Sequence, residues 1–169
     1  MSNLRTNLIR LASEKPDLRR HLLPLLRQSR VEGAAYVAST ATVAETALVK
    51  DSAKIRNYAQ VKDQSQVGGQ ATVEDFARIE DEATITGKAI VSHSAVVGGS
   101  ALVYGYAQIM TYARVSGSAH VSGDAQITGK AQITGKARIG GNAVILGGYW
   151  DGSEGEITSG RWKAPGVPA

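Results

Sequence analysis

A six-residue repeat runs through most of the chain and constrains its fold more than any other feature. From Ala35 to Ala143 every sixth residue is alanine, except at Ser65, and Val or Ile follows two places later in each hexad. The fifth place is mostly Gly, Asp or Asn, which tolerate a left-handed backbone. Because alternate strand residues point to opposite sides, the alanine and the β-branched residue both face inward. Each hexad is therefore predicted to form one short strand and one corner.

A single hexad cannot bury its own apolar side, so the hexads must coil and stack on one another. Three hexads per turn give an 18-residue coil, and residues 35–148 then give about six coils that rise roughly 4.8 Å each. This period places Arg56 beside Glu74 and Lys62 beside Glu80 on adjacent coils. Opposite charges at these spacings support the 18-residue coil.

The repeat resembles the hexapeptide-repeat, left-handed parallel β-helix superfamily. It is most similar to bacterial and phage members with runs such as Ala-His-Val-Ser-Gly-Asp at 119–124, which are labelled putative transferases. The resemblance covers about two-thirds of the chain, and it implies an all-β solenoid of the left-handed type. Such proteins are commonly trimers. The scaffold carries acyltransferases, carbonic anhydrases and non-enzymes, so the fold does not fix the activity. Glycine stands two places after the β-branched residue here, whereas acyltransferase repeats more often place it one after.

The chain is expected to divide into a basic helical arm or cap at 1–30, the β-helix at 31–148, and a capping segment with a tail at 149–169. Residues 1–30 hold seven basic and two acidic side chains, a net charge of +5, and the remaining residues hold twelve and thirteen, a net charge of −1. Leucines at helical spacing favour either a cap over the first coil or a docking arm for a protein or anionic partner. The segment also weakly resembles a leader of phage-encoded proteins. The docking arm would use the following cations: Arg5, Arg10, Arg19, Arg20, Arg27 and Arg30.

Both tryptophans of the chain lie after the repeat, at Trp150 and Trp162. An open β-helix exposes its apolar interior and an unpaired strand edge, and both need covering. We therefore expect residues 149–162 to form a hairpin-like lid in which the two indoles cover the last coil, with ligand stacking as the alternative role.

Two histidines inside the repeat, His93 and His120, are the candidates for catalysis. By resemblance, an acyltransferase would use a histidine as general base beside a loop that leaves the coil, with CoA or acetyl-CoA bound between subunits. The hexads leave no room for such a loop, and neither histidine is expected to have an acidic partner on an adjacent coil. An exposed histidine of this kind is usually ordinary surface. A zinc site with three histidines is excluded by spacing, because His93 and His120 are one and a half coils apart.

Three carboxylates, Glu45, Asp63 and Asp81, share one corner position in successive coils. A calcium ion could use such a column. The favoured interpretation is that these residues form turns and point to water, so no metal is expected.

An apolar stripe is the last outward feature of the repeat. Tyr58, Phe76 and Tyr112 share one corner, and Ile90 and Met110 lie on the neighbouring face. A flat apolar stripe is more typical of a subunit interface than of a substrate pocket, so it is the predicted contact of a homotrimer. Binding of a polysaccharide or another surface through the aromatic residues is the alternative.

The chain has no cysteine and no run of roughly 20 apolar residues, so disulfides and a membrane span are not expected. The charge of the repeat gives no argument for nucleic-acid binding. The first interpretation is a non-catalytic scaffold of about six coils in the cytoplasm of a bacterium or phage-infected cell, or in a virion. It requires no cofactor, and an acyltransferase is the main alternative.

Overall fold

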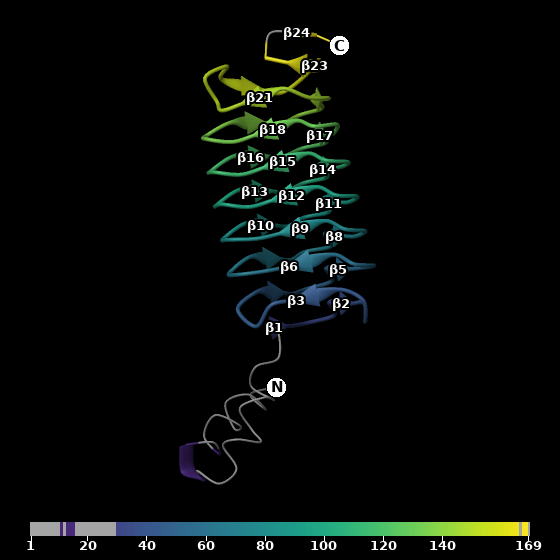
Figure 1. Cartoon of the computed structure of the whole chain (residues 1–169), viewed down its shortest axis with the longest axis vertical. Coiled ribbons are helices and arrows are strands. Elements are labelled where there is room, and N and C mark those ends of the chain that lie inside the picture. The colour runs from purple at the N-terminus through teal and green to yellow at the C-terminus, as the bar shows by residue number, and fades with distance from the viewer. Residues whose placement is uncertain (1–10, 12, 16–29, 166, 169) are drawn as a thin grey trace.

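The computed structural model describes residues 11, 13–15, 30–165 and 167–168 of the chain, and residues 30–165 form a three-sided rod (Figure 1). Leu11, Ser13 and Glu14 are helical. Of the cations predicted for a docking arm, five lie outside the described residues. The sixth, Arg30, belongs to the first strand of the rod and pairs with Leu48. No helix among the described residues has the length and apolar character that a membrane crossing requires.

Three parallel sheets form the three sides of the rod. Sheet A contains β1 (Arg30–Val31), β4 (Leu48–Val49), β7 (Gln66–Val67), β10 (Thr84–Ile85), β13 (Leu102–Val103), β16 (His120–Val121), β19 (Arg138–Ile139) and β22 (Glu156–Ile157). Sheet B contains β2 (Tyr36–Val37), β5 (Lys54–Ile55), β8 (Thr72–Val73), β11 (Ile90–Val91), β14 (Gln108–Ile109), β17 (Gln126–Ile127), β20 (Val144–Ile145), β23 (Arg161–Ala164) and β24 (Val167–Pro168). Sheet C contains β3 (Thr42–Val43), β6 (Gln60–Val61), β9 (Arg78–Ile79), β12 (Val96–Val97), β15 (Arg114–Val115), β18 (Gln132–Ile133) and β21 (Tyr149–Trp150).

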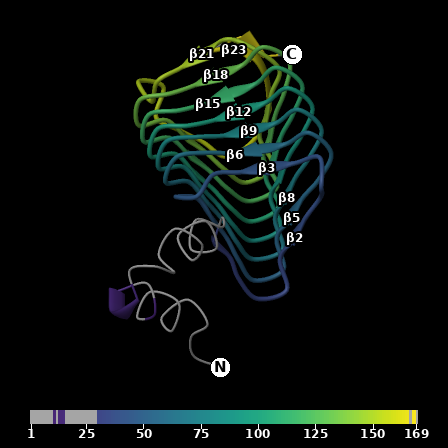
Figure 2. The same cartoon turned by 60° about the horizontal axis from the view of Figure 1, so that its bottom comes forward.

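The chain passes from sheet A to B to C in every coil, and the coils stack in register (Figure 2). Residues 18 apart are partners through most of the rod, as in Gln66↔Thr84. The parallel β-helix with an 18-residue coil is thus confirmed. The rod has about seven coils, one more than the hexads predict, because strands form on both sides of the counted repeat.

The C-terminal segment continues the coil, which corrects the expected hairpin-like lid. Strands β21, β22 and β23 each pair in parallel with the coil before them. The partner of Gln132 is Tyr149, so one residue is lost from the period there. Among the strands of the described residues, only β24 is antiparallel, and it pairs with β23. The hexad pattern ends at 148 although the solenoid does not, because bulkier residues take the inward places of the last coil.

The interior is a column of small and β-branched side chains. From Ala47 to Ile145 the first and third residues of every hexad are at most 2% exposed. The one polar residue in this set is Ser65, whose hydroxyl donates a hydrogen bond to the carbonyl oxygen of Lys62. That bond satisfies the buried hydroxyl, so serine is tolerated where alanine is the rule.

The corners owe their shape to the fifth residue of each hexad. At every such position from 51 to 141 the backbone is left-handed, with φ between 53° and 74°. Most of these residues are Gly, Asp or Asn, which reach this region at the smallest cost. The conformation also aims the sixth residue outward at each corner, and this produces columns of exposed side chains along the rod.

Candidate functional site

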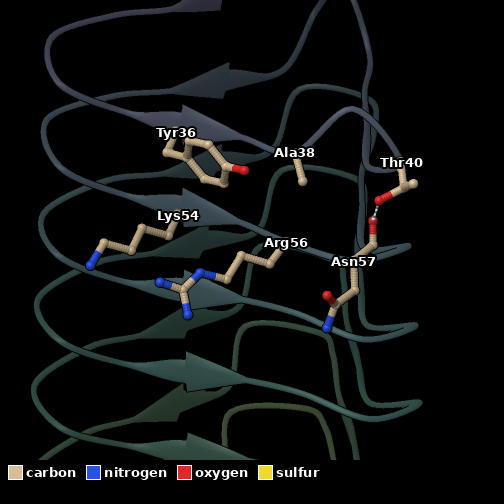
Figure 3. A pocket seen from close by; sticks show the side chains of 6 residues that line it. All are labelled: Tyr36, Ala38, Thr40, Lys54, Arg56 and Asn57. Atoms are coloured by element: carbon tan, nitrogen blue, oxygen red, sulfur yellow. Dashed lines mark hydrogen bonds between the residues drawn. The ribbon is translucent and has the colours of Figure 1, made fainter.

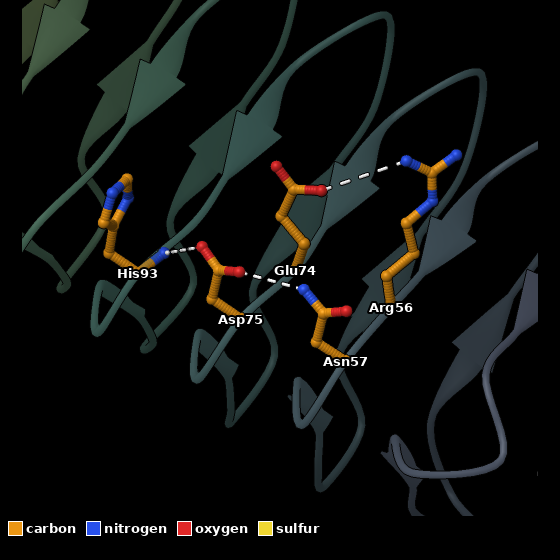
Figure 4. Close-up of polar contacts among 5 residues, drawn as sticks. All are labelled: Arg56, Asn57, Glu74, Asp75 and His93. Atoms are coloured by element: carbon orange, nitrogen blue, oxygen red, sulfur yellow. Dashed lines mark hydrogen bonds and ion pairs between the residues drawn. The ribbon is translucent and has the colours of Figure 1, made fainter.

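A polar column lies on the corner between sheets B and C, called here the B–C corner (Figure 4). The side-chain amide of Asn57 donates to Asp75 Oδ1 at 2.9 Å, and the backbone N–H of His93 donates to Asp75 Oδ2 at 3.1 Å. Beside the column, Arg56 Nη1 lies 4.0 Å from Glu74 Oε2, so this predicted ion pair is confirmed. These contacts join three coils at one corner.

The second predicted charge pair, Lys62 with Glu80, does not form. The two residues are adjacent in register, as the pairing of β6 with β9 requires. Among the described residues, however, no ion pair joins them. Register alone places two long side chains on neighbouring coils, but it does not hold their charged ends together.

His93 has an acidic residue on an adjacent coil, so the expectation that it lacks one was wrong. Asp75 lies 18 residues before it, but its carboxylate accepts the main-chain N–H of His93 rather than contacting the ring. Nδ1 of the ring lies 3.0 Å from the hydroxyl oxygen of Ser92, which is 5% exposed. The imidazole is therefore oriented by a hydroxyl, without the carboxylate that commonly orients a catalytic histidine.

The aromatic residues of the same corner form a partial ladder. The rings of Tyr58 and Phe76 are stacked, with centroids 5.4 Å apart and planes 6° from parallel. They are 57% and 64% exposed, and Tyr112, two coils further, is 61% exposed. Ser94 takes the coil between Phe76 and Tyr112. The ladder is a solvent-exposed edge of the rod.

Ile90 and Met110 lie on sheet B beside this corner, in a surface with one charged residue, Glu74. The outward residues of sheet B and the residues that follow its strands are partly or fully buried and uncharged over five coils, apart from Glu74. We call this surface the sheet-B panel, and it comprises Thr72, Ile90, Ser92, Gln108, Met110, Gln126, Thr128, Val144 and Leu146. The panel is flat because each strand has the same length and register.

The carboxylate column on the corner between sheets C and A is engaged with backbone. The N–H of Asp81 donates to Asp63 Oδ2 at 3.1 Å, and the N–H of Gly99 donates to Asp81 Oδ2 at 2.7 Å. The side chain of Glu45 makes no hydrogen bond to any of the described residues. Within the described residues, no three His, Asp or Glu side chains are grouped so that they could hold a metal ion.

His120 lies in a different setting, a shallow hollow of about 240 Å³ lined by Ser118, His120, Lys136 and Arg138. His120 and Arg138 are register partners on β16 and β19 of sheet A. Ser118 and Lys136 occupy successive coils of the adjoining corner. We call this site the His120 hollow. The sequence analysis considered only acidic neighbours of His120 and missed the basic ones. The 18-residue period places Arg138 next to His120 and Lys136 next to Ser118.

A second basic hollow, of about 420 Å³, lies near the start of the rod (Figure 3). Lys54 and Arg56 project into it below Tyr36, and the hydroxyl of Thr40 donates to the carbonyl oxygen of Asn57. Arg56 is already paired with Glu74. This hollow therefore has one cation with an acidic partner, which distinguishes it from the His120 hollow.

The two tryptophans take inward positions in the last coil. Trp150 is 1% exposed and pairs in register with Ile133, and Trp162 pairs with Ile145. The indoles meet edge to face, with centroids 6.4 Å apart. Each indole N–H donates to a carbonyl three residues earlier, Gly147 for Trp150 and Ser159 for Trp162. Large rings thus occupy the places that Val and Ile hold elsewhere.

Next to Trp150, the backbone N–H of Ser153 donates to Asp151 Oδ1 at 2.9 Å. This bond and one from the side chain of Ser153 lower the pKa of Asp151 below its ordinary value. The carboxylate form is favoured because both bonds donate to it.

Comparisons with protein-family models, with curated proteins and with solved structures found no match to this chain. The structure itself defines the class, a parallel β-solenoid.

Proposed function

We propose that this chain is a non-catalytic solenoid scaffold that self-associates as a homotrimer through the sheet-B panel. The observation that carries the proposal is the absence of charge from sheet B over the four coils from Ile90 to Leu146; the one charge on the coil before them, Glu74, is paired with Arg56. Sheets A and C both carry charged outward residues over the same coils, such as Arg138 and Arg114. Depletion of charge is the compositional mark of the core of a protein interface.

Flatness supports the same proposal. The panel has no loop that leaves the coil, and its polar members are the uncharged residues Thr, Ser and Gln, which can be buried if they find hydrogen-bond partners. A flat, uncharged side of a three-sided rod can meet copies of itself around a closed axis. The aromatic ladder on the B–C corner would lie at the rim of this contact.

The test is the molar mass of the full chain in solution, by light scattering and sedimentation. We expect three times the chain mass of 17.7 kDa. Met110→Glu should shift the mass toward the monomer, because a charge buried in an interface without a partner is costly. Leu48→Glu is the matched control, since Leu48 is also an apolar, partly buried outward residue, but on sheet A. A monomeric wild type contradicts self-association, and a trimer that tolerates Met110→Glu contradicts the panel as its contact.

A second candidate function, binding of a polysaccharide, rests on the stacked and exposed rings of Tyr58 and Phe76. Aromatic faces on a surface pack against the apolar faces of sugar rings. Phe76→Ala should then abolish retention on immobilised polysaccharide, whereas Tyr149→Ala, an exposed tyrosine away from the ladder, should not. Equal retention of both variants contradicts this function.

A further inference from the structure

We infer that the His120 hollow binds a tetrahedral oxyanion, the phosphate or sulfate group of a small ligand. Four side chains from two adjacent coils line it, as the segments Ser118–His120 and Lys136–Arg138. Each segment contributes one corner residue and one strand residue. The hollow faces outward from sheet A and the adjoining corner, on the side of the rod away from the B–C corner.

The basic groups of the hollow have no partners of their own. No hydrogen bond or ion pair engages the side chains of His120, Lys136 or Arg138 in the part of the chain that the structure describes. No carboxylate lines the hollow. Glu156 follows Arg138 in the register of sheet A and is the nearest carboxylate in that sheet, but it forms no ion pair with Arg138. An anion would therefore relieve repulsion between cations without displacing an existing bond.

The donor types match an oxyanion with several oxygens. The guanidinium of Arg138 offers a planar pair of N–H donors, and the ammonium of Lys136 offers a mobile charge. Ser118 adds a hydroxyl donor, and the ring of His120 becomes a cationic donor when protonated. A hollow of about 240 Å³ has room for one such group, with the rest of the ligand outside.

The same corner shows the opposite sign on earlier coils, so the positive charge of the hollow is a local feature. There a hollow of about 480 Å³ is lined by Asp63, Asp81 and Glu82, with no cation. The rod thus presents an acidic and a basic hollow along one corner. An anion should select the latter.

The experiment is a nuclear magnetic resonance titration of the full chain with inorganic sulfate, at constant ionic strength held with chloride. We expect saturable shifts confined to the amides of residues 117–120 and 135–138. Arg138→Gln and Lys136→Gln should each weaken binding about tenfold, the loss of one charge-assisted hydrogen bond. Arg114→Gln, which removes an exposed cation from sheet C in the hexad that ends at Ser118 but not from the lining of the hollow, should change the affinity less than about twofold.

A pH series sharpens the test. Lowering the pH through the range in which histidine gains a proton should strengthen sulfate binding, and His120→Gln should remove that dependence. The other charged groups facing His120 are Lys136 and Arg138, with Glu156 one coil beyond. Phosphate and a sugar phosphate are titrated in parallel. Tighter binding of phosphate indicates a site for a free ion, and tighter binding of the sugar phosphate indicates a site for an esterified group.

Shifts that fail to saturate, or that Arg114→Gln weakens as much as Arg138→Gln, would mean general attraction to the surface and overturn the inference. Circular dichroism of each variant verifies that the fold is kept. The result does not depend on the molar mass of the assembly, since the hollow and the sheet-B panel lie on different sides of the rod.

Discussion

The first and second halves of the rod turn the same corners with different residues. In the first half most corners carry Asp or Asn, and the carboxylates of Asp51, Asp63, Asp75 and Asp81 each accept the backbone N–H of the residue one coil further on. In the second half most corners carry glycine, and on two of the three corners glycine stands over glycine. A Cβ on Gly117 would lie only 2.8 Å from the backbone nitrogen of Gly135.

The difference shows that the left-handed backbone conformation at the corners can be stabilised in two physical ways. Asp and Asn tolerate left-handed φ and add a side-chain bond between coils. Glycine adds no bond, but it reaches that φ without strain and lets successive coils approach closely. The first half should therefore respond to loss of a hydrogen bond, and the second half to added volume.

The largest effect should come from the core, which is the same beneath both kinds of corner. Val97→Asp places an unpaired charge among residues that are 0% exposed and should cost roughly 4 kcal/mol or more. Val96→Asp should cost less than about 1 kcal/mol, although Val96 is only 9% exposed, because Arg78 and Arg114 flank it in register and can pair with the new carboxylate. Urea unfolding of both variants checks this, and equal losses would contradict the hexad register.

Added volume should separate the two halves next. Gly117→Ala should cost roughly 3 kcal/mol, since it combines a left-handed φ with a clash against Gly135. Gly155→Ala is the matched control: its φ is +80°, but a Cβ there meets nothing within 4 Å. It should cost about 1 kcal/mol from backbone strain alone. If thermal unfolding shows equal losses, close stacking is not what selects glycine in the second half.

A smaller effect is expected from the aspartate ladder. Asp81→Ala removes the acceptor for the N–H of Gly99 and leaves alanine at φ 59°, so it should cost about 1–2 kcal/mol. Asp81→Asn keeps an acceptor oxygen and a residue suited to this φ, and it should cost less than about 0.5 kcal/mol. An Asn variant as unstable as the Ala variant in urea would show that the negative charge, not the bond, is what counts.

The smallest effect concerns Asp151, whose carboxylate is held by Ser153 within one turn and not by another coil. Its pKa in the folded chain lies below the ordinary value of 3.8, because the backbone and side chain of Ser153 donate hydrogen bonds to the carboxylate. Its contribution to stability is therefore present above that value and is lost as the pH falls through the lower, folded value. Asp151→Asn should lose less stability than the wild type when urea unfolding is repeated below about pH 4. An identical loss in both proteins would contradict a role for this carboxylate.

The fold could be predicted from the sequence because every hexad follows the same pattern of residue types. Alanine, the β-branched residue and the corner residue each mark a fixed place, so strand positions, inward faces and the 18-residue register follow by counting. The rule ends at 148, where Tyr149 and Trp150 depart from the hexad but keep the parallel pairing. Counting could not reveal that last coil, because pairing there depends on how large rings fit an existing edge.

The outward side chains were less predictable, and the reason is also physical. Register placed Arg56 beside Glu74 and Lys62 beside Glu80, yet only the first pair forms, because exposed ion pairs are weak enough for rotamer choice to decide. The sequence analysis did not predict Asp75 as a neighbour of His93, although the two residues are 18 apart and the period therefore places them on adjacent coils. The left-handed type of the coil and the trimer remain predictions.

The constant period also gives the rod a length that changes only in whole steps. Each coil contacts only its two neighbours, and between Arg30 and Ile139 partner residues are 18 apart. Loss or duplication of any 18 consecutive residues in this stretch would leave the corners, the core and the side-chain columns aligned across the join. The rod would become shorter or longer by one strand spacing, roughly 4.8 Å. A gene that encodes such a repeat can therefore change the distance between the two ends of the rod by gaining or losing whole 18-residue units.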